Sequence, residues 1–124
     1  MIRLLLPLVL AALPLSARAH EVAKGPNGGR VVDTAGHHVE LVAEGTQLVL
    51  FLTGEADQPL ASAGSKNARA IVQDGGKTAT VSLSPAEPNK LVGTLAQPLG
   101  RGARIVVSAT MADGHAVQAR FAQD

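Results

Sequence analysis

The chain has 124 residues, a formal net charge of +1, no cysteine, tryptophan or tyrosine, and only two phenylalanines. The lack of cysteine excludes a disulfide scaffold, a thiolate metal site, an iron–sulfur cluster and a cysteine nucleophile. Phe51 and Phe121 are too few to form an aromatic stacking platform, and the near-neutral charge balance predicts no basic patch for a nucleic-acid backbone. We therefore expect no nucleic-acid partner.

The N-terminus has the pattern of an export signal. Arg3 supplies a positive charge ahead of the apolar run Leu4–Leu15, and Ser16–Ala19 ends in the small–x–small pattern that signal peptidase accepts. This run is shorter than the roughly 20 residues needed to span a bilayer. We expect cleavage after Ala19 to release a soluble protein that begins at His20 and has no membrane span. Its lack of disulfides favours the periplasm over an extracellular location.

After the signal (1–19), the pattern predicts a single all-β domain. Residues 20–29 are expected to form an extended arm, because Gly25 to Gly29 consists almost entirely of turn-forming residues. Residues 30–124 contain short runs of alternating polar and apolar positions, separated by turn signals about every 8–12 residues. Seven or eight short antiparallel strands predict a small Ig-like β-sandwich, with a small barrel as the alternative.

The expected strands follow from this alternation. In chain order they lie at 30–33, 37–44, 47–53, 68–74, 77–84, 89–95, 103–111 and 115–122, with a weak edge strand at 60–64. The strand at 47–53 is apolar on both faces, since Val49 and Phe51 alternate with leucines, and is predicted to be central in its sheet. Gly75-Gly76 and Ala112-Asp113-Gly114 are expected to close two hairpins.

No catalytic constellation is evident in the sequence. The serines lie near turns without the nucleophile-elbow pattern, and the carboxylates are scattered along strands as on a solvated face. The run Gly25 to Gly29 lacks the Lys-Ser/Thr pair and the helix of a phosphate-binding loop. We therefore predict that the protein is not an enzyme and has no organic cofactor.

The four histidines are the chemically richest residues of the exported chain. After cleavage, the α-amino group and a ring nitrogen of His20 would chelate one ion, an arrangement that prefers Cu(II). His37 and His38 are consecutive on an expected strand and so point to opposite faces. We predict that His38, which shares its face with Glu40, joins His20.

Asp113 and His115 form a second candidate pair. Asp113-Gly114-His115 brings a carboxylate and an imidazole together across a tight turn, a donor set suited to Cu(II) or Zn(II). The predicted metal ligands are therefore His20, Asp113 and His115, with His38 as a fourth. The alternative is that these are surface histidines beside a common hairpin signal. In that case we expect a metal-free envelope module that docks on a partner through a sheet edge or the Gly-rich arm.

The segment from Lys24 to Asp33, with its continuation from Gly36 to Val42, resembles a group of small exported bacterial proteins. Residues 89–91 and 119–121 fit the same group, so the likeness covers most of the exported chain. The G-P-x-G-G…G…x-E-L pattern is also similar to a segment near the N-terminus of periplasmic adaptors of heavy-metal efflux pumps. Those adaptors often carry histidine where this chain has Asn27. This resemblance implies metal handling, with such an adaptor or another envelope protein as partner.

A second resemblance is to the CopC-type periplasmic copper proteins, which are small β-sandwiches. His20 is similar to their N-terminal histidine, and Asp113-Gly114-His115, with Phe121 beyond, is similar to their late Asp-x-His and the strand after it. The rest of their N-terminal pattern is absent. The resemblance implies that His20, Asp113 and His115 bind Cu(II). We therefore predict a periplasmic accessory protein that binds Cu(II) or Zn(II) and buffers the ion or passes it to an efflux system.

Overall fold

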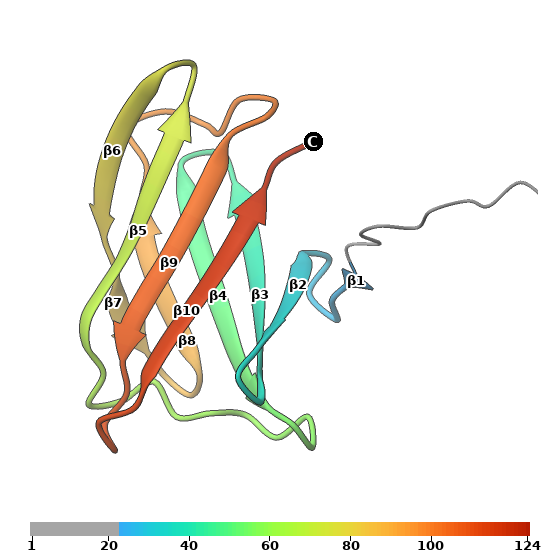
Figure 1. Cartoon of the computed structure of the whole chain (residues 1–124), viewed down its shortest axis with the longest axis vertical. Coiled ribbons are helices and arrows are strands. Elements are labelled where there is room, and N and C mark those ends of the chain that lie inside the picture. The colour runs from blue at the N-terminus through green and yellow to red at the C-terminus, as the bar shows by residue number, and fades with distance from the viewer. Residues whose placement is uncertain (1–22) are drawn as a thin grey trace, which may run out of the picture.

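The computed structural model describes residues 23–124, which form two stacked antiparallel sheets without a helix (Figure 1). One sheet has six strands in the order β1-β2-β3-β4-β8-β7, and the other has four in the order β10-β9-β5-β6. The two sheets do not close into a barrel, which confirms the predicted small β-sandwich over its alternative. The expected export signal lies outside the described residues, as does His20. Within residues 23–124, nothing helical is long and apolar enough to cross a membrane.

The strands largely follow the polar–apolar alternation of the sequence. The six-stranded sheet contains β1 (Ala23–Lys24), β2 (Arg30–Thr34), β3 (His37–Glu44), β4 (Gln47–Gly54), β7 (Ser84–Ala86) and β8 (Lys90–Thr94). The four-stranded sheet contains β5 (Lys66–Asp74), β6 (Lys77–Ser82), β9 (Arg104–Thr110) and β10 (Ala116–Ala122). The count of ten exceeds the predicted seven or eight mainly because β1 and β7 are very short edge strands. Residues 60–64 form no strand, and only an isolated bridge joins Pro59 to Thr53 nearby.

The core lies between the two sheets. On β4, Leu48, Leu50 and Leu52 are buried and alternate with half-buried Val49 and Phe51 on the outer face. The pairing of β4 with β3 on one side and β8 on the other confirms its predicted central place. Inward side chains of the four-stranded sheet complete the core, namely Ala70, Val72, Ile105, Val107, Ala109, Val117, Ala119 and Phe121. Each large apolar side chain buried in this way stabilises the fold by about 1.5–3 kcal/mol.

One long edge of the sandwich is closed by a seam between β2 and β10, which lie against each other although they belong to different sheets (Figure 1). The Thr34 hydroxyl donates a hydrogen bond to the Gln118 carbonyl at 2.8 Å. Near the other end of the seam, the Arg30 guanidinium donates to the Ala122 carbonyl and forms an ion pair with Asp124. The seam therefore fixes the first residues of β3 and β10 beside one another.

Candidate functional site

Two histidines meet at the end of the seam, one from each sheet. His37 is the first residue of β3, and His115 immediately precedes β10, 78 positions later in the sequence. Their rings stack with centroids 4.7 Å apart and planes inclined by 24°. The two Nε2 atoms face each other at 2.9 Å. The fold therefore brings together two imidazoles that the sequence places in separate hairpins.

The hydrogen bonds on the far side of each ring define which nitrogen carries the hydrogen. Nδ1 of His37 lies 3.0 Å from the Ala35 carbonyl oxygen, which can only accept. Nδ1 of His115 contacts a carboxylate oxygen of Asp113, which accepts as well. In the neutral form of either ring, a hydrogen on Nδ1 leaves a lone pair on Nε2. With both rings neutral, the lone pair on Nε2 of His37 therefore lies close to the lone pair on Nε2 of His115.

Two lone pairs at this separation require a cation to relieve their repulsion. A proton on either Nε2 converts the contact into a hydrogen bond, for which 2.9 Å is an ordinary length. A metal ion satisfies both nitrogens as well, because two nitrogens each about 2.0–2.1 Å from one ion and about 90° apart lie about 2.9 Å from each other. Since the ring planes are inclined by only 24°, coordination requires the rings to turn until both lone pairs converge on the ion.

Asp113 is placed to orient His115. Its carboxylate also accepts the backbone N–H of His115 at 3.1 Å. This backbone hydrogen bond, together with the one from the ring, lowers the pKa of Asp113 below its usual value and keeps the carboxylate charged. A metal-bound histidine usually donates its other ring N–H to a carboxylate or a backbone carbonyl. Here the Asp113 carboxylate accepts from His115, and the Ala35 backbone carbonyl accepts from His37.

His38 lies apart from this pair, on the outer face of the six-stranded sheet. Its Nδ1 contacts the Asp33 carboxylate, and this hydrogen bond raises the pKa of His38, with the nearby charges of Asp33, Asp57 and Glu55 adding to the effect. His38 and Asp33 help to line a hollow of about 490 Å³ on that face. The expected alternation of β3 is therefore present, and it sends His38 away from His115 and brings His37 to it.

The sequence-predicted ligands are thus distributed over three places. Asp113 and His115 contact each other, His38 pairs with Asp33, and His20 lies outside the described residues. His37 was not predicted, although one signal pointed to it. That signal is the alternation of β3, which puts His37 on the same face as Val39 and Leu41. These two side chains are buried, so His37 lies on the inner face, at the first position of the strand. Across residues 23–124, no group of three or more histidine or acidic side chains could hold a metal.

The glycine-rich run forms a loop that closes on Glu40. This carboxylate is only 4% exposed and accepts the backbone N–H and side-chain amide of Asn27, at 3.0 and 2.9 Å, and the backbone N–H of Gly29, at 2.8 Å. A Cβ on Gly25 would lie 2.3 Å from the Glu40 carboxyl carbon, and one on Gly29 would lie 2.3 Å from the Leu41 carbonyl oxygen. The G-P-x-G-G and x-E-L segments are therefore joined in a structural contact without a histidine.

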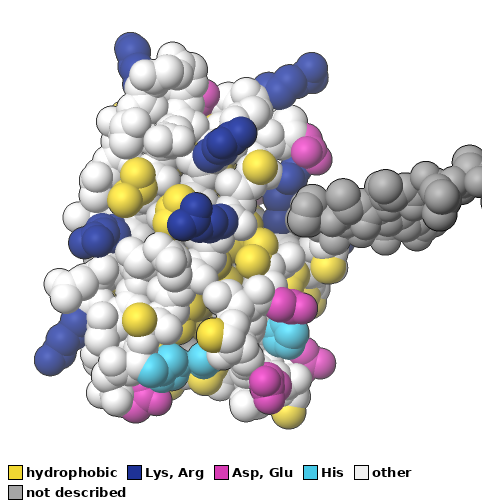
Figure 2. All heavy atoms as spheres, viewed as in Figure 1, with side chains coloured by type: hydrophobic (Ala, Val, Ile, Leu, Met, Phe, Trp, Pro, Cys, Tyr) yellow, Lys and Arg dark blue, Asp and Glu magenta, His cyan; other side chains and the backbone are white. Residues whose placement is uncertain are grey.

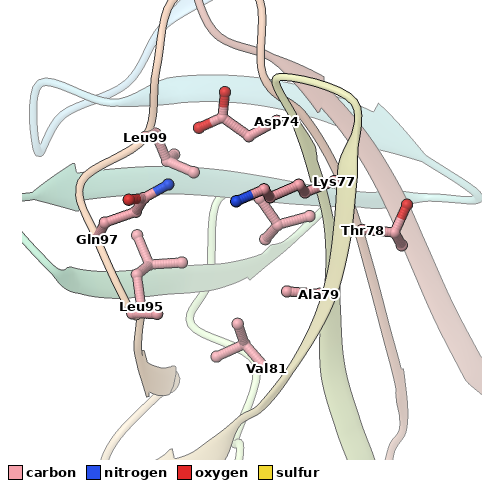
Figure 3. Close-up of a pocket in the computed structure, with 10 residues that line it drawn as sticks. Asp74, Lys77, Thr78, Ala79, Val81, Leu95, Gln97 and Leu99 are labelled. Atoms are coloured by element: carbon pink, nitrogen blue, oxygen red, sulfur yellow. The ribbon is translucent and has the colours of Figure 1, made fainter.

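A second hollow lies at the other end of the sandwich, between the β5–β6 hairpin and residues 95–99 (Figure 3). Its volume is about 340 Å³, and its apolar lining includes Val72, Val81, Leu95 and Leu99. The Asp74 carboxylate at its rim accepts the backbone N–H of Gly100 at 2.8 Å. Because its lining contains no histidine, this cleft is not the candidate metal site.

No family model, curated protein or solved structure matches the chain. The resemblances to efflux adaptors and to CopC-type proteins therefore stay predictions. His37 and His115 are the two described residues whose ring nitrogens approach each other closely enough to share an ion.

Proposed function

We propose that this protein binds one Cu(II) or Zn(II) ion through the Nε2 atoms of His37 and His115, as a periplasmic accessory protein in metal homeostasis or efflux. The observation that carries the proposal is the 2.9 Å approach of these two nitrogens. Each ring is held from behind by a hydrogen bond to Nδ1, so Nε2 is the free nitrogen of both, and a turn of the rings would direct the two lone pairs to one ion.

The charge distribution supports a cationic ligand. Asp33, Glu55, Asp57 and Asp113 lie in strands and turns at the same end of the sandwich as the histidine pair. Figure 2 shows the histidines and most of the acidic side chains on this side in the lower part of the molecule, whereas most lysines and arginines lie above them. Such a grouping raises the local concentration of divalent cations and speeds their association.

The donor set favours Cu(II) over Zn(II). Imidazole sites bind Cu(II) more tightly than Zn(II) in the usual order of divalent metals. The rings turn on binding, so the ion itself sets the final separation of the two nitrogens.

Two protein ligands suit an exchangeable ion better than a permanent one. Structural zinc sites use four protein ligands and catalytic ones commonly three, so a site with two leaves several positions for water or for a donor from another molecule. We infer that the ion is held for transfer, and that an efflux adaptor or another envelope protein supplies the remaining ligands.

A titration with Cu(II) and Zn(II) in competition with a chelator tests the proposal. The exported form should carry His20→Ala, which removes the imidazole of any chelate formed at the N-terminus. We expect one ion per chain, with nitrogen couplings in the electron paramagnetic resonance spectrum of the Cu(II) form. His37→Gln and His115→Gln should each abolish it, and His38→Gln is the matched control.

The proposal fails if His38→Gln weakens binding as much as the other two variants do. It also fails if the wild-type protein binds no ion at all, since the histidine pair is then held together by a proton alone. That second result would favour the metal-free interaction module.

A further inference from the structure

The outer face of the four-stranded sheet carries an uncompensated positive charge. Arg69 of β5, Arg104 of β9 and Arg120 of β10 are exposed on this face, because their neighbours on either side in the chain point into the core. None of the three has a carboxylate within ion-pairing distance among residues 23–124, where the one arginine ion pair joins Arg30 to Asp124. Within the described part of the chain, the three guanidinium groups of this face therefore have no ion-pair partner.

The strand register shows how these arginines are arranged. Ile71 pairs with Val106, and Val106 pairs with Arg120, so two half-buried aliphatic side chains and one arginine form the middle row. Arg69 pairs with Ser108 in the row on one side, and Arg104 pairs with Gln73 in the row on the other. The arginines thus surround a small aliphatic centre, and no carboxylate lies in these three rows.

The face is broad, and no described strand or loop lies over it. In Figure 1 the four-stranded sheet lies in front of the other sheet, and no other element crosses it. Figure 2, viewed from the same side, shows basic side chains spread over the middle and upper part of this surface with apolar patches between them. Such a surface suits a broad, flat partner.

A polar hollow beside Arg104 offers a place for an anionic group. Its volume is about 380 Å³, and it is lined by Gln73, Asp74, Gly75, Gly76, Lys77, Thr78, Gly102 and Arg104. The three glycines have no atom within 4 Å of the position of a Cβ, so their backbone is open to solvent. The one carboxylate, that of Asp74, already accepts the backbone N–H of Gly100 at 2.8 Å. Arg104, Lys77 and Thr78 remain as donors.

We propose that this face docks on an anionic phospholipid surface, with the three arginines contacting phosphate groups and Ile71 and Val106 resting against the interface. The planar guanidinium matches phosphate with two parallel hydrogen bonds. Each arginine near an anionic surface strengthens binding about fivefold, and three give about a hundredfold. The binding is therefore weak, reversible and sensitive to salt.

Other anionic partners fit this face less well. Single-stranded nucleic acid needs aromatic side chains for stacking, and the chain has only two phenylalanines, one of them in the core. In a second copy, the acidic groups cluster at the histidine end of the sandwich, so a contact with the basic face would be head-to-tail and would not close into a dimer. When this face rests on a membrane, the end of the sandwich that carries the histidine pair is not covered. Membrane docking therefore does not depend on metal binding.

Co-sedimentation with vesicles tests the proposal, using the form that begins at His20 and so contains every described strand. We expect binding to phosphatidylglycerol vesicles at low salt, loss of binding at physiological salt and no binding to phosphatidylcholine vesicles. The double variant Arg69→Gln/Arg120→Gln should bind phosphatidylglycerol about 30-fold more weakly. Its matched control, Lys24→Gln/Lys90→Gln, removes the same charge from the opposite sheet and should bind like the wild type.

Three results would overturn the proposal. The first is an equal loss in both double variants, which would assign the effect to net charge. The second is equal binding to both kinds of vesicle, and the third is no binding to phosphatidylglycerol even at low salt. Binding of the wild type to an acidic polypeptide but not to these vesicles would assign the face to a protein partner and would also reject a lipid surface.

Discussion

Nε2 of His37, the first residue of β3, lies 2.9 Å from Nε2 of His115, which immediately precedes β10 of the opposite sheet. An ion bound between them would join the sheets at the end of the seam formed by β2 and β10. Its binding would therefore be coupled to the stability of the whole sandwich, because the unfolded chain does not hold the two rings together.

The first prediction concerns this coupling. At a free Cu(II) concentration of 100 times the dissociation constant, the wild-type protein should be stabilised by about 2.7 kcal/mol, provided that the unfolded chain binds no metal. Thermal unfolding followed by far-ultraviolet circular dichroism measures the effect, since the chain has almost no aromatic absorbance. His115→Gln should show no such shift, whereas His38→Gln should keep it. An equal shift in both variants would contradict the assignment.

The second prediction separates orientation from ligation. Asp113→Asn should weaken metal binding about 10- to 100-fold without abolishing it, because the carboxylate holds the His115 ring from behind. Asp33→Asn makes the same change beside His38 and should leave metal affinity unchanged. Competition titrations of the two variants provide the measurement. Complete loss of binding in Asp113→Asn alone would make Asp113 a ligand.

The third prediction is a pH dependence at His38. Its pKa is raised in the folded protein above the ordinary 6.5, chiefly by the hydrogen bond to Asp33. The folded state therefore binds the proton more tightly than the unfolded state, and the resulting stability is fully present below about 6.5 and is lost as the pH rises through the folded pKa. Urea unfolding from pH 5 to pH 8 should show this decline, and Asp33→Asn should remove it. A wild-type profile that rises over this range would contradict it.

The fourth prediction concerns the loop that closes on Glu40. Glu40→Ala leaves the donors of Asn27 and Gly29 without their acceptor, which should destabilise the protein by about 1–3 kcal/mol in urea unfolding. Gly29→Ala should also destabilise it, because the new Cβ would collide with the Leu41 carbonyl oxygen. Glu44→Ala, at the exposed end of the same strand, should change stability by less than about 0.5 kcal/mol. A Glu40→Ala variant as stable as Glu44→Ala would show that the contact contributes little.

The fifth prediction tests the core. Leu50 is fully buried on the central strand β4, so Leu50→Ala should cost about 2–5 kcal/mol through lost burial and the cavity that remains. Val49→Ala on the outer, half-buried side of the same strand should cost clearly less. Urea unfolding of both variants gives the comparison, and equal losses would contradict the inside–outside assignment of β4.

The alternation of side chains made much of the fold predictable. The leucines of β4, together with Val49 and Phe51 between them, correctly placed that strand in the middle of its sheet, because a strand this apolar at an exposed edge would pair with other chains. Gly75 and Gly76 correctly marked the hairpin that pairs Asp74 with Lys77, since both glycines adopt the positive φ of a tight turn.

The contacts across the sandwich could not be predicted in the same way. Alternation correctly separated His37 from His38, but it does not say which strand of the other sheet faces which, so the approach of His115 to His37 has no local signal. The arginine face was missed for a related reason. A net charge of +1 averages over the chain, whereas Arg69, Arg104 and Arg120 come together only once the register of β5, β9 and β10 is known.

The loop over Glu40 bears on how this sequence pattern is interpreted. The glycines at 25 and 29 depend on the carboxylate at 40 and the carboxylate depends on the loop, because positions 25 and 29 leave no room for a side chain and the loop supplies the hydrogen bonds to Glu40. If residues 25–29 were transferred to another pair of strands, a glutamate equivalent to Glu40 would have to be transferred with them. In this chain the G-P-x-G-G and x-E-L segments are therefore explained by packing and hydrogen bonding alone, and a metal ligand has to be sought elsewhere, at the start of β3.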